Sequence, residues 1–133
     1  MGVSSALQKL IIARLRTVPS LGGRVYDSPT EGAVMPFANI GPSYFVRADA
    51  ECIRGRSETL QIDVWGDSKP NRAALKNAVD EVVEALDGYA DTDALTMHPL
   101  RVGLVRIMDD PQAGVVHGVV QVEAAVETPL VSP

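Results

Sequence analysis

Hydrophobic and polar side chains alternate with a period of two between Ser57 and Gly66. Leu60, Ile62 and Val64 point to one side in this pattern. Such alternation predicts a β-strand with one buried face. The opposite side of the strand receives Thr59, Gln61, Asp63 and Trp65.

The period then changes to helical spacing, which predicts a helix from Lys69 to Leu86. Asp67 or Ser68 is expected to cap its start, Pro70 to lie in its first turn and Gly88 to end it. The predicted apolar stripe consists of Leu75, Ala78, Val79, Val82, Val83 and Leu86. A strand and a helix in tandem, each with one apolar face, need a common core.

The N-terminal part of the chain repeats the helical spacing. Val3 to Arg16 is predicted as a helix, capped by Ser4 or Ser5 and ended before Pro19. A short extended piece follows at residues 24–26. The Pro- and Gly-rich segment from Asp27 to Met35 is expected to be an exposed loop.

Three more strands complete the pattern. Residues 36–46 suit a strand with a bulge or break at Gly41-Pro42, because proline cannot donate to a ladder. A long polar connection from Arg47 to Arg56 should join this strand to an antiparallel neighbour starting at Ser57. Residues 100–108 and 115–127 alternate around a turn at 109–114. Side chains expected to face inward from these two segments are Leu100, Val102, Leu104, Met108, Val116, Val120, Val122, Ala124 and Val126.

This order of elements predicts an α+β fold: one mainly antiparallel, mixed sheet of about four to five strands with two main helices packed on one face. The 133 residues suggest a single domain over 1–133, with a loose C-terminal tail from about residue 128.

Composition excludes several classes of protein. Twelve basic and seventeen acidic side chains give a net charge of −5, and no basic run of the kind that grips nucleic acid occurs. No apolar run approaches the roughly 20 residues that span a bilayer. Charged residues near the start argue against a secretory signal. Cys52 is the one cysteine, so an internal disulfide is ruled out and a reducing compartment is expected.

Candidate chemistry is sparse. His98 and His117 lie in different predicted elements, each expected to have a structural role, since a metal site needs three or four converging ligands. Cys52 lacks a nearby histidine base. Asp109 and Asp110 are explained by their turn, and no phosphate-binding or nucleophile-elbow motif occurs. We therefore predict no catalytic, metal or cofactor-binding residues, no cofactor and no enzymatic activity. Trp65 is expected to pack in the core or on a helix.

Several segments resemble one family in their order and wording. They are Gly23-Arg24-Val25-Tyr26-Asp27, Pro36-Phe37-Ala38-Asn39-Ile40-Gly41, Leu60-Gln61-Ile62-Asp63-Val64-Trp65, the helix from Lys69 to Leu86, and the hairpin from Arg106 to Val119. Together, from about Leu7 to Glu127, they resemble the tail-completion, or tail-terminator, family of long-tailed phages and gene transfer agents.

The resemblance implies a structural virion protein, assembled in the bacterial cytoplasm and located in the tail of a phage or gene transfer particle. Members of this family form a homo-oligomeric ring, usually hexameric, on the head-proximal end of the tail tube. The implied partners are further copies of the chain, the tail tube protein and the head–tail connector or stopper. DNA would pass through the ring without specific binding, and no membrane is involved.

The candidate interfaces are an open sheet edge that could pair with a neighbouring copy and the polar loops at Asp27 to Met35 and Arg47 to Arg56. Mixed charges there can set the register between subunits. The candidates are Arg47, Asp49, Glu51, Arg54, Arg56, Asp27 and Glu31. Two alternatives stay open: another head–tail joining protein (adaptor or stopper), and a small ligand-binding α+β domain.

Overall fold

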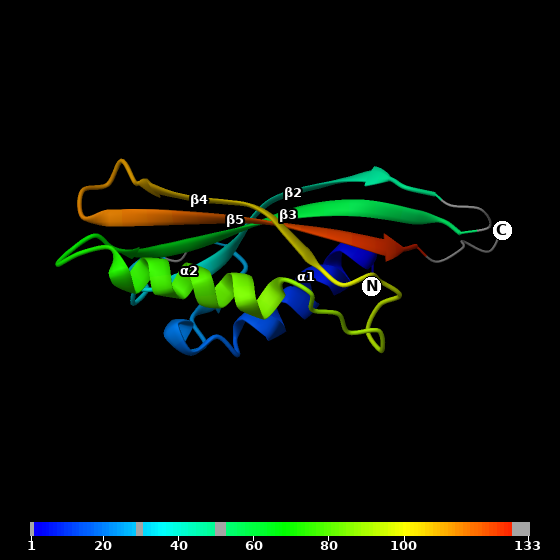
Figure 1. Ribbon diagram of the computed structural model, residues 1–133, viewed down its shortest axis with the longest axis horizontal. Helices are drawn as coiled ribbons and strands as arrows, with labels where there is room; N and C mark the ends of the chain where they lie inside the picture. The colour runs from blue at the N-terminus through cyan, green and yellow to red at the C-terminus, as the bar shows by residue number, and fades with distance from the viewer. Residues whose placement is uncertain (1, 29–30, 50–52, 129–133) are drawn as a thin grey trace.

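A computed structural model describes residues 2–28, 31–49 and 53–128 of the chain. One five-stranded sheet carries two α-helices on the same face, as Figure 1 shows. The α+β prediction is therefore confirmed. The elements are α1 (Val3–Leu15), a 3-10 turn η1 (Pro19–Leu21), β1 (Val25–Tyr26), β2 (Phe37–Arg47), β3 (Gly55–Asp67), α2 (Ala73–Leu86), β4 (Arg101–Asp109) and β5 (Val115–Glu127). The expected loose tail beyond Thr128 lies outside the described residues.

The strand order in the sheet is β1-β2-β3-β5-β4. Only the short β1 runs parallel to its neighbour, with Val25 beside Ala38; the other pairs are antiparallel. Ile62 of the central strand β3 lies between Ile40 on one side and Val120 on the other. The sheet is thus mixed but mainly antiparallel, as expected.

The core lies between the sheet and the two helices. Leu60, Ile62 and Val64 are at most 1% exposed, which confirms the period-two prediction for β3. The α2 stripe is buried against them, except that Val83 is only partly buried. From α1 and the following turn, the core receives Leu7, Leu10, Ile11, Leu15, Val18 and Leu21. Neither helix of the described residues has the length and apolar content needed to cross a membrane.

The start of the second helix and the cap of the first differ from prediction. The second helix begins at Ala73, because β3 stays paired with β5 as far as Asp67 and a connection must follow. Asp67 and Pro70 therefore precede the helix, and the Oδ1 of Asn71 accepts a hydrogen bond from the Ala73 N–H at 2.9 Å. At the other end Gly88 adopts φ 82° and stops α2, as predicted.

The first helix begins at Val3 after an extended Gly2, so neither Ser4 nor Ser5 caps it. The Ser4 hydroxyl instead donates to Oε1 of Glu58 at 2.8 Å. A contact with a distant strand has replaced the local cap.

β2 and β4 each contain a register shift. The predicted irregularity at Gly41-Pro42 is confirmed by a register shift between Ile40 and Ser43. The second shift, between Val102 and Val105, breaks the alternation of β4 and leaves Leu104 46% exposed, so its inward placement was wrong. The polar connection is shorter than expected, because β2 and β3 pair as far as Arg47 and Arg56.

Gly118 of β5 provides a test of the sheet–helix packing. A Cβ at this position would lie 2.7 Å from Cγ2 of Val79 in α2, so Gly118→Ala should destabilise the fold by about 1–3 kcal/mol through overpacking. Gly103→Ala is the matched control, because its nearest atom, Oε1 of Glu123, is 3.7 Å away. Urea denaturation of both variants measures the difference, and equal midpoints would contradict this packing.

Candidate interaction surface

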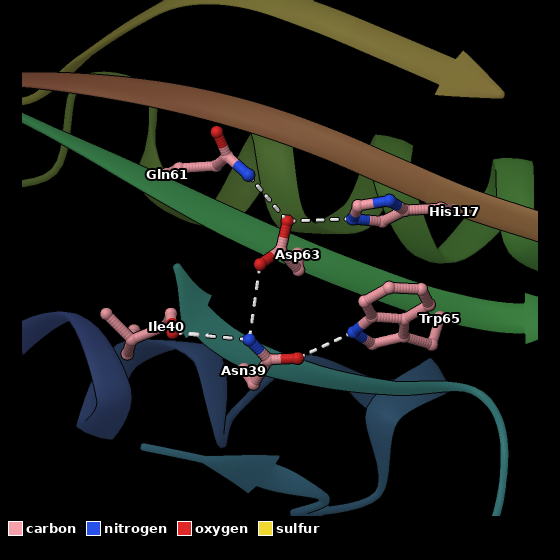
Figure 2. Close-up of polar contacts among 6 residues, drawn as sticks. All are labelled: Asn39, Ile40, Gln61, Asp63, Trp65 and His117. Carbon is pink, nitrogen blue, oxygen red and sulfur yellow. Dashed lines mark hydrogen bonds and ion pairs between the residues drawn. The ribbon is translucent and has the colours of Figure 1, made fainter. Parts of the chain in front are cut away.

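The face of the sheet that the helices do not cover carries a polar cluster of Asn39, Gln61, Asp63, Trp65 and His117 (Figure 2). Oδ1 of Asp63 lies 2.7 Å from Nε2 of His117 and accepts from Nε2 of Gln61 at 2.8 Å. The other carboxylate oxygen, Oδ2, accepts from Nδ2 of Asn39 at 3.2 Å. The Asn39 side-chain oxygen accepts from the Trp65 indole N–H at 2.6 Å. One carboxylate thus ties three neighbouring strands together.

The side chains of this cluster are unusually buried and closely packed for the uncovered face of a sheet. Asn39 is 1% and Asp63 7% exposed, and the Trp65 and His117 rings stack with centroids 3.9 Å apart. A Cβ on Gly41 would lie 2.7 Å from Oδ2 of Asp63, so the glycine at the β2 bulge makes room for the cluster. A His–Asp pair needs a nucleophile to act in acyl transfer, and none of these five side chains carries a hydroxyl or thiol. These hydrogen bonds join β2, β3 and β5, and Trp65 stacks on His117, not on a helix as expected.

Four of the predicted interface residues lie at one end of the sheet, in a segment that we call the distal hairpin (residues 43–49 and 53–60). Nη2 of Arg47 contacts Oδ2 of Asp49 at 2.6 Å, and Oδ1 of Asp49 accepts from the Gly55 N–H at 3.1 Å. The Gly55 hydrogen bond, assisted by Arg47, lowers the pKa of Asp49, so this carboxylate stays charged in mildly acidic solution. Arg54 is exposed, and Glu51 lies outside the described residues.

Arg56 points inward, unlike its neighbours in the distal hairpin. Its Nη1 donates to the Ser4 hydroxyl at 3.0 Å and lies 3.6 Å from Oε1 of Glu58, which is 1% exposed. Its guanidinium also covers the Phe45 ring at 3.9 Å. Arg56 thus contacts Ser4, Glu58 and Phe45 of its own chain.

The remaining two predicted interface residues, Asp27 and Glu31, are not part of the distal hairpin. Asp27 accepts a hydrogen bond from Nε2 of Gln8, and Glu31 is exposed in a turn. Asp27 directly follows Tyr26, which pairs with Asn39. Arg47 lies roughly 26 Å beyond Asn39 along β2, at the usual rise per residue of a strand.

Exposed apolar side chains on β2 and β4 form a feature that the sequence analysis missed. On β2, Tyr44 is 64%, Phe45 50% and Val46 57% exposed; on β4, Leu104 is 46% and Val105 39% exposed. The signal was present in the sequence. Three consecutive large apolar residues in a strand cannot all face one core, so at least one must be exposed unless both faces of the sheet are covered.

Beside the distal hairpin lies an open, mainly apolar hollow of about 360 Å³, lined among others by Ile53, Met97, His98 and Val126. No group of three or more His, Cys, Asp or Glu side chains within residues 2–28, 31–49 and 53–128 could hold a metal ion. The His98 N–H donates to the Ala125 carbonyl of β5, the strand that also carries His117.

Exposed apolar strand edges and a charged hairpin on an α+β module are typical of proteins that assemble with other chains. The chain matches the family described as "Tail completion protein gp17" over residues 9–127, and it belongs to that family. It is thus a structural protein of phage-type tails, which confirms the family resemblance of the sequence.

Comparison with solved structures gives the same fold. One chain of the structure described as "Virion of native gene transfer agent (GTA) particle" superposes with a TM-score of 0.78 at 23% identity, covering 94% of this chain and 97% of the other. No curated protein matches the chain by sequence.

Proposed function

We propose that this protein is a ring-forming tail terminator without enzymatic activity. Copies of the chain close into a ring, of six subunits, on the head-proximal end of the tail tube. The ring stops tube polymerisation and joins the tail to the capsid connector or stopper, while DNA passes through its centre without specific binding. The protein is assembled in the bacterial cytoplasm and stays in the tail of the particle.

The observation that supports this proposal is the pair of unlike apolar edges. β2 and β4 lie toward opposite sides of one sheet, and each carries exposed large side chains. Ring closure requires a heterologous contact, in which one patch meets a different patch on the next copy. Two different edges that face away from each other satisfy that requirement.

The family membership supports the place of this ring in the particle. A protein that completes a tail must contact the tail tube on one side and the head side on the other. The charged distal hairpin lies at one end of the sheet, whereas Asp27 follows β1, which pairs with the first part of β2; these two regions offer such surfaces.

Particles that lack this protein test the proposed role. Electron micrographs should show overlong tails without heads, because nothing stops the tube or joins it to the capsid. The purified protein mixed with tail tubes should form a closed oligomer near six copies, measured by light scattering after chromatography. Tails of normal length that merely fail to attach would indicate an adaptor or stopper instead, and a strict monomer in the presence of tubes would contradict the ring.

Arg54→Glu is expected to reduce particle assembly while leaving the fold intact. The Arg54 side chain is exposed, so reversing its charge removes no core contact. At an interface, the same reversal opposes complementary charges and lowers the rate of association. The readout is the yield of complete particles, with Lys76→Glu on the exposed side of α2 as the control for charge. Normal yield from Arg54→Glu would remove this residue from the interface.

A further inference from the structure

We infer that the free edge of β2 in one copy pairs antiparallel with β4 of the next copy, so that the ring is held by a continuous β-sheet. In this contact Tyr44, Phe45 and Val46 meet Leu104 and Val105 of the neighbour. The occupant of each edge is therefore a second copy of this chain. The inference rests on the proposed ring and specifies its interface.

The β2 edge has unpaired backbone groups. β1 covers β2 only at Ala38 and Asn39, and no other described strand lies on that side. The Ala48 N–H donates to the Gly55 carbonyl, toward β3. Because hydrogen-bonded and non-bonded pairs alternate in an antiparallel ladder, the amides of Phe45 and Arg47 point away from β3 toward the open side.

The β4 edge is open in the same way. β4 is the last strand in the order, and it pairs only with β5. The Asp110 N–H donates to the Val115 carbonyl, so the same alternation directs the amides of Asp109, Ile107 and Val105 outward. Each edge thus offers donors and acceptors at every second residue, which is the template for strand addition.

Strand directions favour this pair of edges. β2, β3, β5 and β4 alternate in direction without interruption, so β4 runs opposite to β2. A neighbour placed beside β4 with little rotation in the plane of the sheet therefore presents its β2 antiparallel to β4. The alternation continues from one subunit to the next, as it does within one subunit.

The positions of the apolar residues require a stagger between copies. Phe45 pairs with Glu58, which in turn pairs with Ala124 of β5, so Phe45 and Ala124 lie at the same height in the sheet. Leu104 lies at a different height, between the pairs Val102–Val122 and Val105–Val120. Bringing the two groups together shifts the neighbour by about three residues, or roughly 10 Å along the strands. Closed arrangements of strands need a stagger of this kind, because their strands tilt relative to the axis.

The size of the contact explains why closure matters. A single strand pair of this length buries less than the roughly 800 Å² per partner that is typical of a stable complex. Each copy in a ring uses both of its edges, which doubles its contacts. A symmetric contact between two β2 edges would occupy only one edge per copy and could not continue.

Cysteine cross-linking tests the pairing. In a Cys52→Ser background, double variants combine Tyr44→Cys or Val46→Cys with Leu104→Cys or Val105→Cys. After mild oxidation in the presence of tail tubes, at least one double variant should give covalent oligomers up to the full ring on a non-reducing gel. Tyr44→Cys combined with Asn77→Cys on α2 is the control and should stay monomeric on the gel.

The outcomes separate this inference from the proposed ring. A closed oligomer by light scattering that forms none of the four disulfides would overturn the β2–β4 contact but keep the ring. Dimers from Tyr44→Cys alone would show the symmetric contact and likewise overturn it. Cross-linked chains that grow without closing would support the pairing and overturn the ring, while neither oligomers nor disulfides would overturn both.

Discussion

Ile62→Asp is expected to leave the subunit unfolded. Ile62 is fully buried in the central strand, between Ile40 and Val120 and beneath the helices. An unpaired carboxylate there costs several kcal/mol, against a total stability of about 5–15 kcal/mol for a typical domain. Far-ultraviolet circular dichroism of the purified variant should show loss of helix and sheet at 25 °C.

Two further variants make this test specific. Val79→Asp puts the same charge on α2, at a side chain that is 1% exposed, and should unfold the protein as well. Ser57→Asp places a carboxylate on β3 itself, at a half-buried position away from the helices, and should fold. A folded Ile62→Asp variant would mean that the helices do not cover this strand.

The second large effect is expected from Arg56→Ala. Removing the guanidinium leaves the Glu58 carboxylate, which is 1% exposed, with the Ser4 hydroxyl in place of an ionic partner. Breaking a buried ion pair by deleting one partner typically costs about 3–5 kcal/mol. The free energy of unfolding from urea denaturation measures the loss.

Arg47→Ala is the matched control for that loss. Its ion pair with Asp49 is shorter, at 2.6 Å, but the two side chains are 74% and 39% exposed. Exposed pairs contribute roughly 0–1 kcal/mol, because water screens the charges. If both arginine variants lost the same stability, burial would not be what makes the Arg56 contact important.

The elements with strong local patterns were predictable. The alternation around Ile62 and the stripe containing Val79 each had one consistent period, so the strand, the helix and their shared core follow from sequence alone. The bulge at Gly41-Pro42 was predictable too, since it depends on a residue that cannot donate a hydrogen bond.

Features that depend on distant partners were not predictable. Ser4 and Glu58 are separated by 54 positions, so a predicted helix cap became a contact beneath the helix. Likewise, Asp63 and His117 are 54 positions apart, and each alone reads as an ordinary polar residue on a strand. Arg56 was grouped with the charges of the polar connection because its sequence neighbours are polar. Its contact with the distant Ser4 could not be predicted from them.

The register shift in β4 had the same cause. The exposure of Leu104 depends on a bulge against β5, where the local signal is Gly103 and is weaker than the proline that marks the β2 bulge. Only the strand order shows that Leu104 lies toward one edge of the sheet and Tyr44 toward the other. The predicted charged residues therefore located the distal hairpin at one end of the sheet, whereas the exposed apolar side chains of β2 and β4 were not predicted.

The stacking of Trp65 on His117 also equips the protein with an intrinsic optical probe. Trp65 is the one tryptophan in the chain, and it lies on the side of the sheet away from both helices. Its fluorescence reports on that outer layer, whereas the ellipticity at 222 nm reports mainly on the helices. Coincident denaturation curves from the two signals would show that both layers of this subunit melt as one cooperative unit.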